Sequence, residues 1–126
     1  MNVIVIDDSE IFRTGIVSYL ENIGDLTTIT DMAYSEEQIY NAINSSTDIV
    51  IIDFEHQSDY GLELIRRLKR DFNKINLIIF THERNERLKL LSERYGADYF
   101  LTKEHQHQNL WKIVENININ LRGKYD

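Results

Sequence analysis

Carboxylate, hydroxyl and ammonium side chains follow short apolar runs at four places in this 126-residue chain. In chain order they are Asp7 and Asp8, Asp53, Thr81, and Lys103. Clustered carboxylates repel one another unless a cation lies among them. Magnesium suits such a cluster, because it binds one or two carboxylates, keeps several waters and accepts phosphate oxygens. A carboxylate beside Mg²⁺ and a lysine can attack phosphorus and form an acyl phosphate, so the set predicts phosphoryl chemistry.

Each of these groups also has a purely structural explanation when it is taken alone. Two aspartates after a strand often cap a helix, a threonine often lies in a turn, and a lone lysine is usually solvated. Asp53 by itself would be a polar residue that ends a strand. The phosphoryl interpretation therefore depends on whether the fold brings the groups together.

The apolar runs before these groups have the character of strands. Residues 48–52 are mainly apolar and β-branched, which is typical of a strand buried on both faces of a parallel sheet. Residues 3–6 and 77–80 have the same character, and residues 99–101 form a shorter run. Residues 26–31 are rich in threonine, which favours a half-exposed strand at the edge of the sheet.

Amphipathic helices are predicted between the strands and after the last one. Ser9 is the expected N-cap of the first helix, although Asp8 could serve instead, and Gly24 is expected to stop the helix. The third helix is expected to begin after Gly61, which closes a polar loop. The fourth helix is predicted over residues 83–95, with Gly96 as its end.

Strands and helices therefore alternate five times, which predicts an α/β fold of the flavodoxin-like type. We expect a five-stranded parallel sheet in the order 2-1-3-4-5, with five helices distributed over both faces. The C-terminal ends of all strands then lie on one edge of the sheet, where the active groups meet. Residues 1–121 are expected to form one domain, and residues 122–126 a C-terminal tail or the start of a linker.

Composition narrows the classes of partner. The net charge is −7, which argues against direct nucleic-acid contact by this domain, because phosphate binding needs a basic surface. No apolar run approaches the roughly 20 residues that cross a bilayer, so no membrane contact is expected. Cysteine is absent, which excludes thiolate metal sites, and a cytoplasmic location is the expectation.

The chain resembles the receiver domain of a two-component response regulator along essentially its whole length. The segments that carry the resemblance are VIVIDDSE at 3–10, DIVIIDFEHQSDYGLELIRRLK at 48–69, LIIFTHE at 77–83 and GADYFLTK at 96–103. The resemblance implies that Asp53 accepts a phosphoryl group from a phosphohistidine on a sensor histidine kinase or a phosphotransfer protein. A homodimer formed on activation is compatible with it.

The same resemblance implies a Mg²⁺ site among the acidic groups. Asp8 would bind the ion directly and Asp7 less directly. Asp53 and the backbone carbonyl of Glu55 would be further ligands. These assignments come from the family pattern and not from the spacing of the residues.

A conformational switch is the further implication of the resemblance. Thr81 and Lys103 would contact the phosphoryl group, and the movement of Thr81 would leave space for Phe100, the switch aromatic, to turn inward. The surface of the fourth helix, fifth strand and fifth helix would then control an output or partner. One such output is transcription, if this domain is the N-terminal part of a DNA-binding regulator.

Three residues depart from the usual receiver pattern. Gln57 and Glu104 stand where the family often has proline, so no cis bond is expected before Glu104. His82 follows Thr81 where most receivers have a small residue. His82 and Glu83 are therefore expected to modulate access to the phosphoryl pocket.

Two other functions are compatible with the residues. A magnesium-dependent phosphatase would turn over free substrate through an aspartyl phosphate, but it normally has Asp two residues after the nucleophile, where this chain has Glu55. It also needs a cap over the substrate, and the chain contains no large insertion. A binding module that is not phosphorylated would use the acidic pocket only structurally. We expect no enzyme activity beyond self-phosphorylation from a donor and slow self-dephosphorylation.

Three further features have ordinary interpretations. His105 and His107 have poor joint geometry for a metal, because they are two residues apart at a helix start. Trp111 fits half-buried packing better than an interface anchor. The basic run at 66–70 is most simply the solvated face of a helix.

Overall fold

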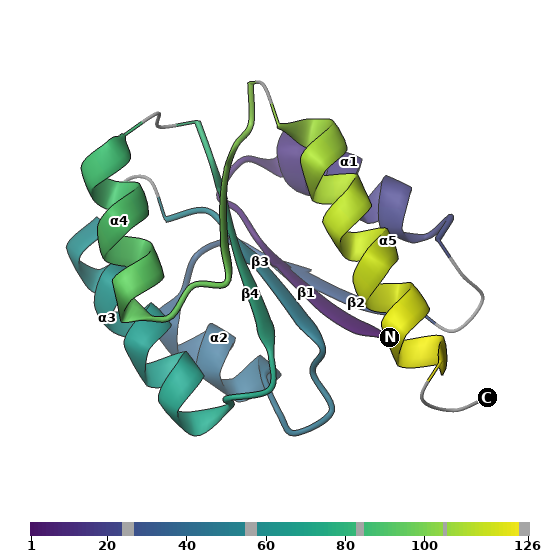
Figure 1. The fold of residues 1–126 in the computed structure, drawn as a ribbon, viewed down its shortest axis with the longest axis horizontal. Coiled ribbons are helices and arrows are strands. Elements are labelled where there is room, and N and C mark those ends of the chain that lie inside the picture. The colour runs from purple at the N-terminus through teal and green to yellow at the C-terminus, as the bar shows by residue number, and fades with distance from the viewer. Residues whose placement is uncertain (24–26, 55–57, 83–84, 105, 124–126) are drawn as a thin grey trace.

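The computed structural model describes residues 1–23, 27–54, 58–82, 85–104 and 106–123, apart from the side chains of residues 58, 59 and 122. Five parallel strands form one sheet in the order β2-β1-β3-β4-β5, which confirms the predicted topology (Figure 1). The strands are β1 (Asn2–Ile6), β2 (Thr28–Met32), β3 (Ile49–Ile52), β4 (Asn76–Thr81) and β5 (Tyr99–Thr102).

Helices cover both faces of the sheet (Figure 1). Helices α1 and α5 pack on one face, and α2, α3 and α4 pack on the other. The helices are α1 (Glu10–Leu20), α2 (Glu36–Ala42), α3 (Ser58–Asp71), α4 (Glu86–Tyr95) and α5 (His107–Gly123). None of the helices in the described ranges has the length and apolar character needed to cross a membrane.

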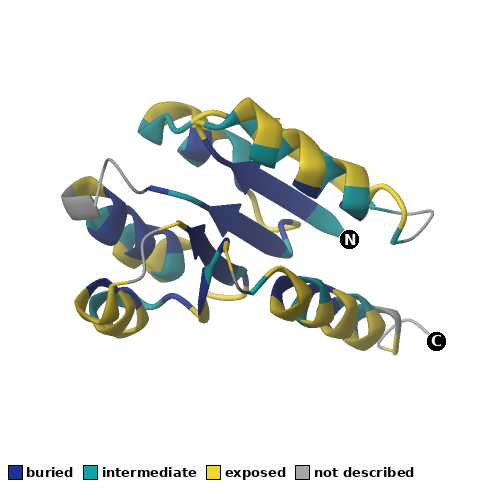
Figure 2. Ribbon diagram, turned by 90° about the horizontal axis from the view of Figure 1, so that it is seen from above, coloured by how far each residue is buried: buried dark blue, intermediate teal, exposed yellow. Residues whose placement is uncertain are grey.

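The core forms two layers because side chains alternate between the faces of each strand. Along β1, Ile4 and Ile6 pack against α2 and α3, whereas Val3 and Val5 pack against α1 and α5. All four residues of β3 are buried, and Figure 2 shows the central strands enclosed by helices with exposed outer faces. Strand β2 lies at the edge and is largely exposed, as its threonines predict.

Helix α1 ends earlier than predicted. Its last residue is Leu20 and its C-cap is Glu21, whereas Gly24, the predicted stop, lies outside the described residues. The side-chain amide of Asn22 donates to the carbonyl of Ser18, and the N–H of Asn22 donates to the carbonyl of Tyr19. These bonds satisfy carbonyls of the last turn, so the helix can end without a glycine.

Helix α3 begins at Ser58, so Gly61 lies inside the helix and does not close the preceding loop as predicted. A Cβ atom at Gly61 would lie 2.3 Å from ring atoms of Phe54. Phe54 is buried directly after Asp53, so the glycine allows the helix to pack closely beside the expected phosphoacceptor. Close packing, and not chain reversal, explains this glycine.

Helix α4 begins at Glu86, three residues later than predicted, because Asn85 is its N-cap. The side-chain oxygen of Asn85 accepts hydrogen bonds from the N–H groups of Arg87 and Leu88. The predicted end is confirmed: Gly96 has a φ of 119°, the left-handed conformation that favours glycine. Helix α5 continues to Gly123, and residues 124–126 lie outside the described part, so the expected tail or linker stays a prediction.

Candidate functional site

The ends of β1, β3 and β5 hold Asp7, Asp53 and Lys103 in fixed positions. The N–H of Asp7 donates to the carbonyl of Met32 at 3.0 Å, and the N–H of Asp53 donates to the carbonyl of Ile6 at 2.9 Å. The N–H of Lys103 likewise donates to the carbonyl of Thr81 at 2.8 Å. Each of these residues thus forms a backbone hydrogen bond to the neighbouring strand, just beyond the end of its own strand.

Lys103 joins the two buried carboxylates at this edge. Its Nζ atom lies 2.6 Å from an Oδ2 atom of Asp7 and 2.6 Å from Oδ2 of Asp53. The side chains of Lys103, Asp7 and Asp53 are 1%, 4% and 10% exposed. The structure therefore brings together three of the groups that the sequence singles out, and the shared ammonium neutralises part of the repulsion between the carboxylates.

The other oxygen of Asp7 connects the site to α1. Asp7 Oδ1 accepts a hydrogen bond of 2.8 Å from the N–H of Ser9. Ser9 is the N-cap of α1, as predicted, and its hydroxyl oxygen accepts from the N–H of Phe12. Arg13, one residue further, donates from Nη1 to the carbonyl of Asp7 and from Nε to Asp31 on β2. The first turn of α1 is therefore fixed by the acidic end of β1.

Asp8 occupies a different position from the other two aspartates. Its side chain is exposed, and its Oδ1 atom accepts a hydrogen bond of 2.8 Å from the N–H of Tyr34. Within the described ranges, no three acidic or histidine side chains lie close enough to form a metal site by themselves. Asp7 and Asp53 converge on Lys103 instead. The atoms that could bind a metal ion here are the carboxylate oxygens of the aspartates, and such oxygens suit Mg²⁺. Glu55, the expected carbonyl ligand, lies outside the described residues.

Thr81 and Phe100 lie on the neighbouring strands. Thr81 ends β4 and is buried. Phe100 is also buried and belongs to the core layer that contains Ile79 and Leu88. Phe100, the expected switch aromatic, therefore lies inside the core in this structure. Glu104 is exposed, and no cis peptide bond occurs among the described residues, as the missing proline predicts.

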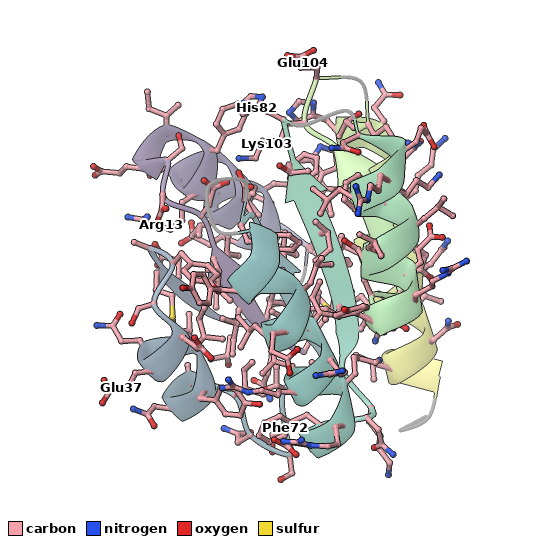
Figure 3. The ribbon with its side chains drawn as sticks, turned by 90° about the vertical axis from the view of Figure 1, so that its left-hand side faces the viewer. Arg13, Glu37, Phe72, His82, Lys103 and Glu104 are labelled. Carbon is pink, nitrogen blue, oxygen red and sulfur yellow. The ribbon has the colours of Figure 1, made fainter. Side chains whose placement is uncertain are left out.

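His82 packs on the ring of Phe12 in α1. The His82 ring is exposed, and its centroid lies 4.7 Å from that of Phe12, with an angle of 80° between the planes. The Phe12 ring in turn lies 4.4 Å from Nζ of Lys103. Figure 3 shows His82 and Lys103 at the same end of the molecule. Glu83, the other residue expected to modulate access to this pocket, lies outside the described part of the chain, and so does Gln57, which stands where the family often has proline.

Comparison with known protein families identifies the domain. A family model described as the response regulator receiver domain matches residues 3–115. The chain is a response regulator receiver domain. The match includes all five strands apart from Asn2 of β1, and the first half of α5.

Relatives and solved structures agree with this assignment. The receiver domain is 24% identical over 112 residues to the nitrate/nitrite response regulator NarL of Escherichia coli. The aligned residues cover 89% of this chain and 52% of NarL. It superimposes on a receiver protein from Pseudoalteromonas atlantica with a TM-score of 0.81, 22% identity, and coverage of 96% and 99%. A Burkholderia pseudomallei response regulator with a phosphorylated aspartic acid, a calcium ion and citrate gives a TM-score of 0.76 at 20% identity, with coverage of 98% and 72%. At these identities the structural matches show the fold alone.

The remaining sequence features of the receiver domain have structural explanations. His107 is exposed and lies edge-on to Phe80 at 5.4 Å, while His105 lies outside the described residues. Trp111 is half-buried and stacks on Tyr19 with ring centroids 3.9 Å apart, which confirms packing. The basic residues of α3 form ion pairs with acidic neighbours, as expected of a solvated helix face: Arg66 with Glu63, Arg67 with Glu36, Lys69 with Asp98, and Arg70 with Asp71.

Proposed function

We propose that this receiver domain is a phosphorylation switch in which Asp53 accepts a phosphoryl group. The donor is a phosphohistidine on a sensor histidine kinase or a phosphotransfer protein. The observation that carries the proposal is the buried ammonium of Lys103 at 2.6 Å from the carboxylates of both Asp53 and Asp7. This arrangement provides Asp53 as a carboxylate nucleophile and Lys103 as a cation that can stabilise the negative charge on a phosphoryl oxygen.

In the transfer, a carboxylate oxygen of Asp53 attacks phosphorus, and the bond from phosphorus to the donor nitrogen breaks. Lys103 keeps its bond to Asp7 and donates to a phosphoryl oxygen, while the Thr81 hydroxyl donates to another. Asp8 and Asp53, with the backbone carbonyl of Glu55, would hold Mg²⁺, and Asp7 would act less directly. When bound, Mg²⁺ would neutralise the charge that develops on the transferring group.

The phosphoryl group adds about 1.5 to 2 negative charges at the end of β3. Thr81 would move toward this charge, and Phe100 would respond within the core layer beneath α4. The surface of α4, β5 and α5 would then differ between the two states. Full reversal of a 1:99 equilibrium requires about 5.5 kcal/mol of differential stabilisation by the phosphoryl group.

The output of the switch is also part of the proposal. The chain spans about half the length of the first curated relatives that it matches, 52% in the case of NarL. We propose that the domain acts in the cytoplasm, pairs with a second copy on activation, and controls transcription through a DNA-binding domain in the same protein. The domain itself carries a net charge of −7 and would not contact the DNA.

A small phosphodonor and Mg²⁺ test the proposal directly. The protein is incubated with acetyl phosphate, and its intact mass is measured before and after treatment with hydroxylamine. We expect one phosphoryl group per chain, lost on hydroxylamine treatment, and no mass gain in Asp53→Asn. Asp71→Asn is the matched control, because Asp71 is ion-paired on α3 outside this site. A normal mass gain in Asp53→Asn would place the acceptor elsewhere, and multiple turnover of the donor would favour the phosphatase alternative.

A further inference from the structure

Phe12 is connected to the buried ammonium of Lys103 both through its ring and through a chain of hydrogen bonds. Asp7 accepts from the N–H of Ser9, and Ser9 accepts from the N–H of Phe12. The ring of Phe12 lies 4.4 Å from Nζ of Lys103, and the same Nζ atom forms a 2.6 Å ion pair with Asp7. One carboxylate therefore fixes both the lysine and the helix turn that carries the ring.

The ring of Phe12 lies where it can stabilise the positive charge of Lys103. An ammonium group has three N–H donors, and two carboxylates account for two of them. The side chain is 1% exposed, so little water can reach it. The face of an aromatic ring within about 6 Å attracts such a cation, most strongly where water is excluded. Phe12 therefore supports the ammonium from a direction that the carboxylates leave open.

We propose that Phe12 is a positioning residue for phosphoryl transfer, because its ring confines the Lys103 ammonium to the position shared by Asp7 and Asp53. During transfer Lys103 must keep its bond to Asp7 while it moves one N–H from Asp53 to a phosphoryl oxygen. The ring limits this movement to a short displacement. An aliphatic side chain of similar size would fill the space but would not attract the ammonium.

His82 extends the same arrangement to β4. Its ring meets the Phe12 ring edge-on at 4.7 Å, so Phe12 lies between the residue after Thr81 and the ammonium of Lys103. Edge-to-face contacts at this separation are favourable. His82, the residue after Thr81, and Lys103 thus both contact one aromatic side chain of α1.

The first test does not require phosphorylation. A ring above an ammonium shifts the NMR signals of the adjacent lysine ε-methylene protons upfield. We expect one lysine of the wild-type chain to show this shift, and we expect Phe12→Leu to abolish it and Phe12→Tyr to keep it. Phe72→Leu is the matched control, because Phe72 is also half-buried but lies at the opposite end of the molecule (Figure 3). An unshifted Lys103 in the folded wild type would overturn the inference.

The second test measures kinetics and rests on the proposed function. With acetyl phosphate and Mg²⁺, we expect Phe12→Leu to slow phosphorylation of Asp53 by about fivefold to thirtyfold, the range that corresponds to a desolvated cation–π contact. Phe12→Tyr should stay close to wild type, and so should Phe72→Leu. Equal rates in folded Phe12→Leu and wild type would overturn the positioning role. If wild type itself is not phosphorylated, the proposed function fails, whereas the NMR shift still decides whether the ring holds the ammonium.

Discussion

The ammonium of Lys103 lies 2.6 Å from a carboxylate oxygen of Asp53, although 50 residues separate the two in the chain. Both are held at the ends of parallel strands, with β4 between them. A buried ion pair of this kind is costly to break from one side, because the remaining charge is left without its partner. The contact therefore places the expected nucleophile and its cation together before any donor binds.

Asp8 and Asp7 should differ in what they contribute. We expect Asp8→Ala to weaken Mg²⁺ binding more than Asp7→Ala, because Asp8 is the exposed carboxylate assigned as the direct ligand. Asp7→Ala should lower the free energy of unfolding more, by about 1 to 3 kcal/mol, because it removes a partner of Lys103 and of the Ser9 N–H. Calorimetric Mg²⁺ titration and thermal melts without the metal measure both effects. Wild-type Mg²⁺ affinity in Asp8→Ala would refute the ligand assignment.

Gly61 and Gly15 are both helical glycines with opposite surroundings. Gly61→Ala should lower the free energy of unfolding by about 1 to 3 kcal/mol, because its Cβ would meet the buried Phe54 ring at 2.3 Å. Gly15→Ala should raise it by about 0.5 to 1 kcal/mol, since nothing lies within 4 Å of the added atom. Urea unfolding measures both values. Unchanged stability in Gly61→Ala would show that Phe54 can move away at little cost.

Tyr19 should make stability depend on alkaline pH. Partial burial, the hydrogen bond to Glu115 and the negative charge of Glu115 raise the pKa of Tyr19 to about 12. Between pH 10 and 12 the unfolded chain loses this proton before the folded chain does, so the stability due to Tyr19 is complete below pH 10 and decreases as pH rises through that window. Tyr19→Phe lacks this dependence.

The difference in unfolding free energy between wild type and Tyr19→Phe should therefore shrink as pH increases over that range. Glu115→Gln should lower the pKa of Tyr19. Ultraviolet titration of tyrosinate measures this change against the background of the other six tyrosines in the chain. A titration that is the same with and without Glu115 would rule out the charge and the hydrogen bond as causes.

His82 should control access to the phosphoryl group. We expect His82→Ala to speed both phosphorylation and dephosphorylation of Asp53, because the imidazole beside Phe12 is larger than the side chain usual at this place. We expect Phe12 to keep its contact with Lys103 in this variant, so the change in access should dominate both rates. Mass measurements over time give both rates. His107→Ala, an exposed histidine that contacts Phe80, is the control. If neither rate changes, the His82 side chain does not cover the pocket.

The amino-acid sequence alone determined the order of the strands and the edge where the active groups meet. Runs such as residues 49–52 are short, β-branched and apolar throughout, which predicts central strands, and their alternation with helices predicts that all of them run parallel. Asp53 and Lys103 then lie at the same edge, because each directly follows the end of its strand. These conclusions need only local pattern and connectivity.

The tertiary structure decided which of these groups actually touch. Local pattern assigns Phe12 to the apolar face of α1, but it carries no information on the ammonium that approaches from the end of β5. It likewise could not separate Asp7, paired with Lys103, from Asp8, which turns to the N–H of Tyr34. Periodicity predicts which face of an element a residue lies on, whereas contacts between elements depend on how distant segments pack.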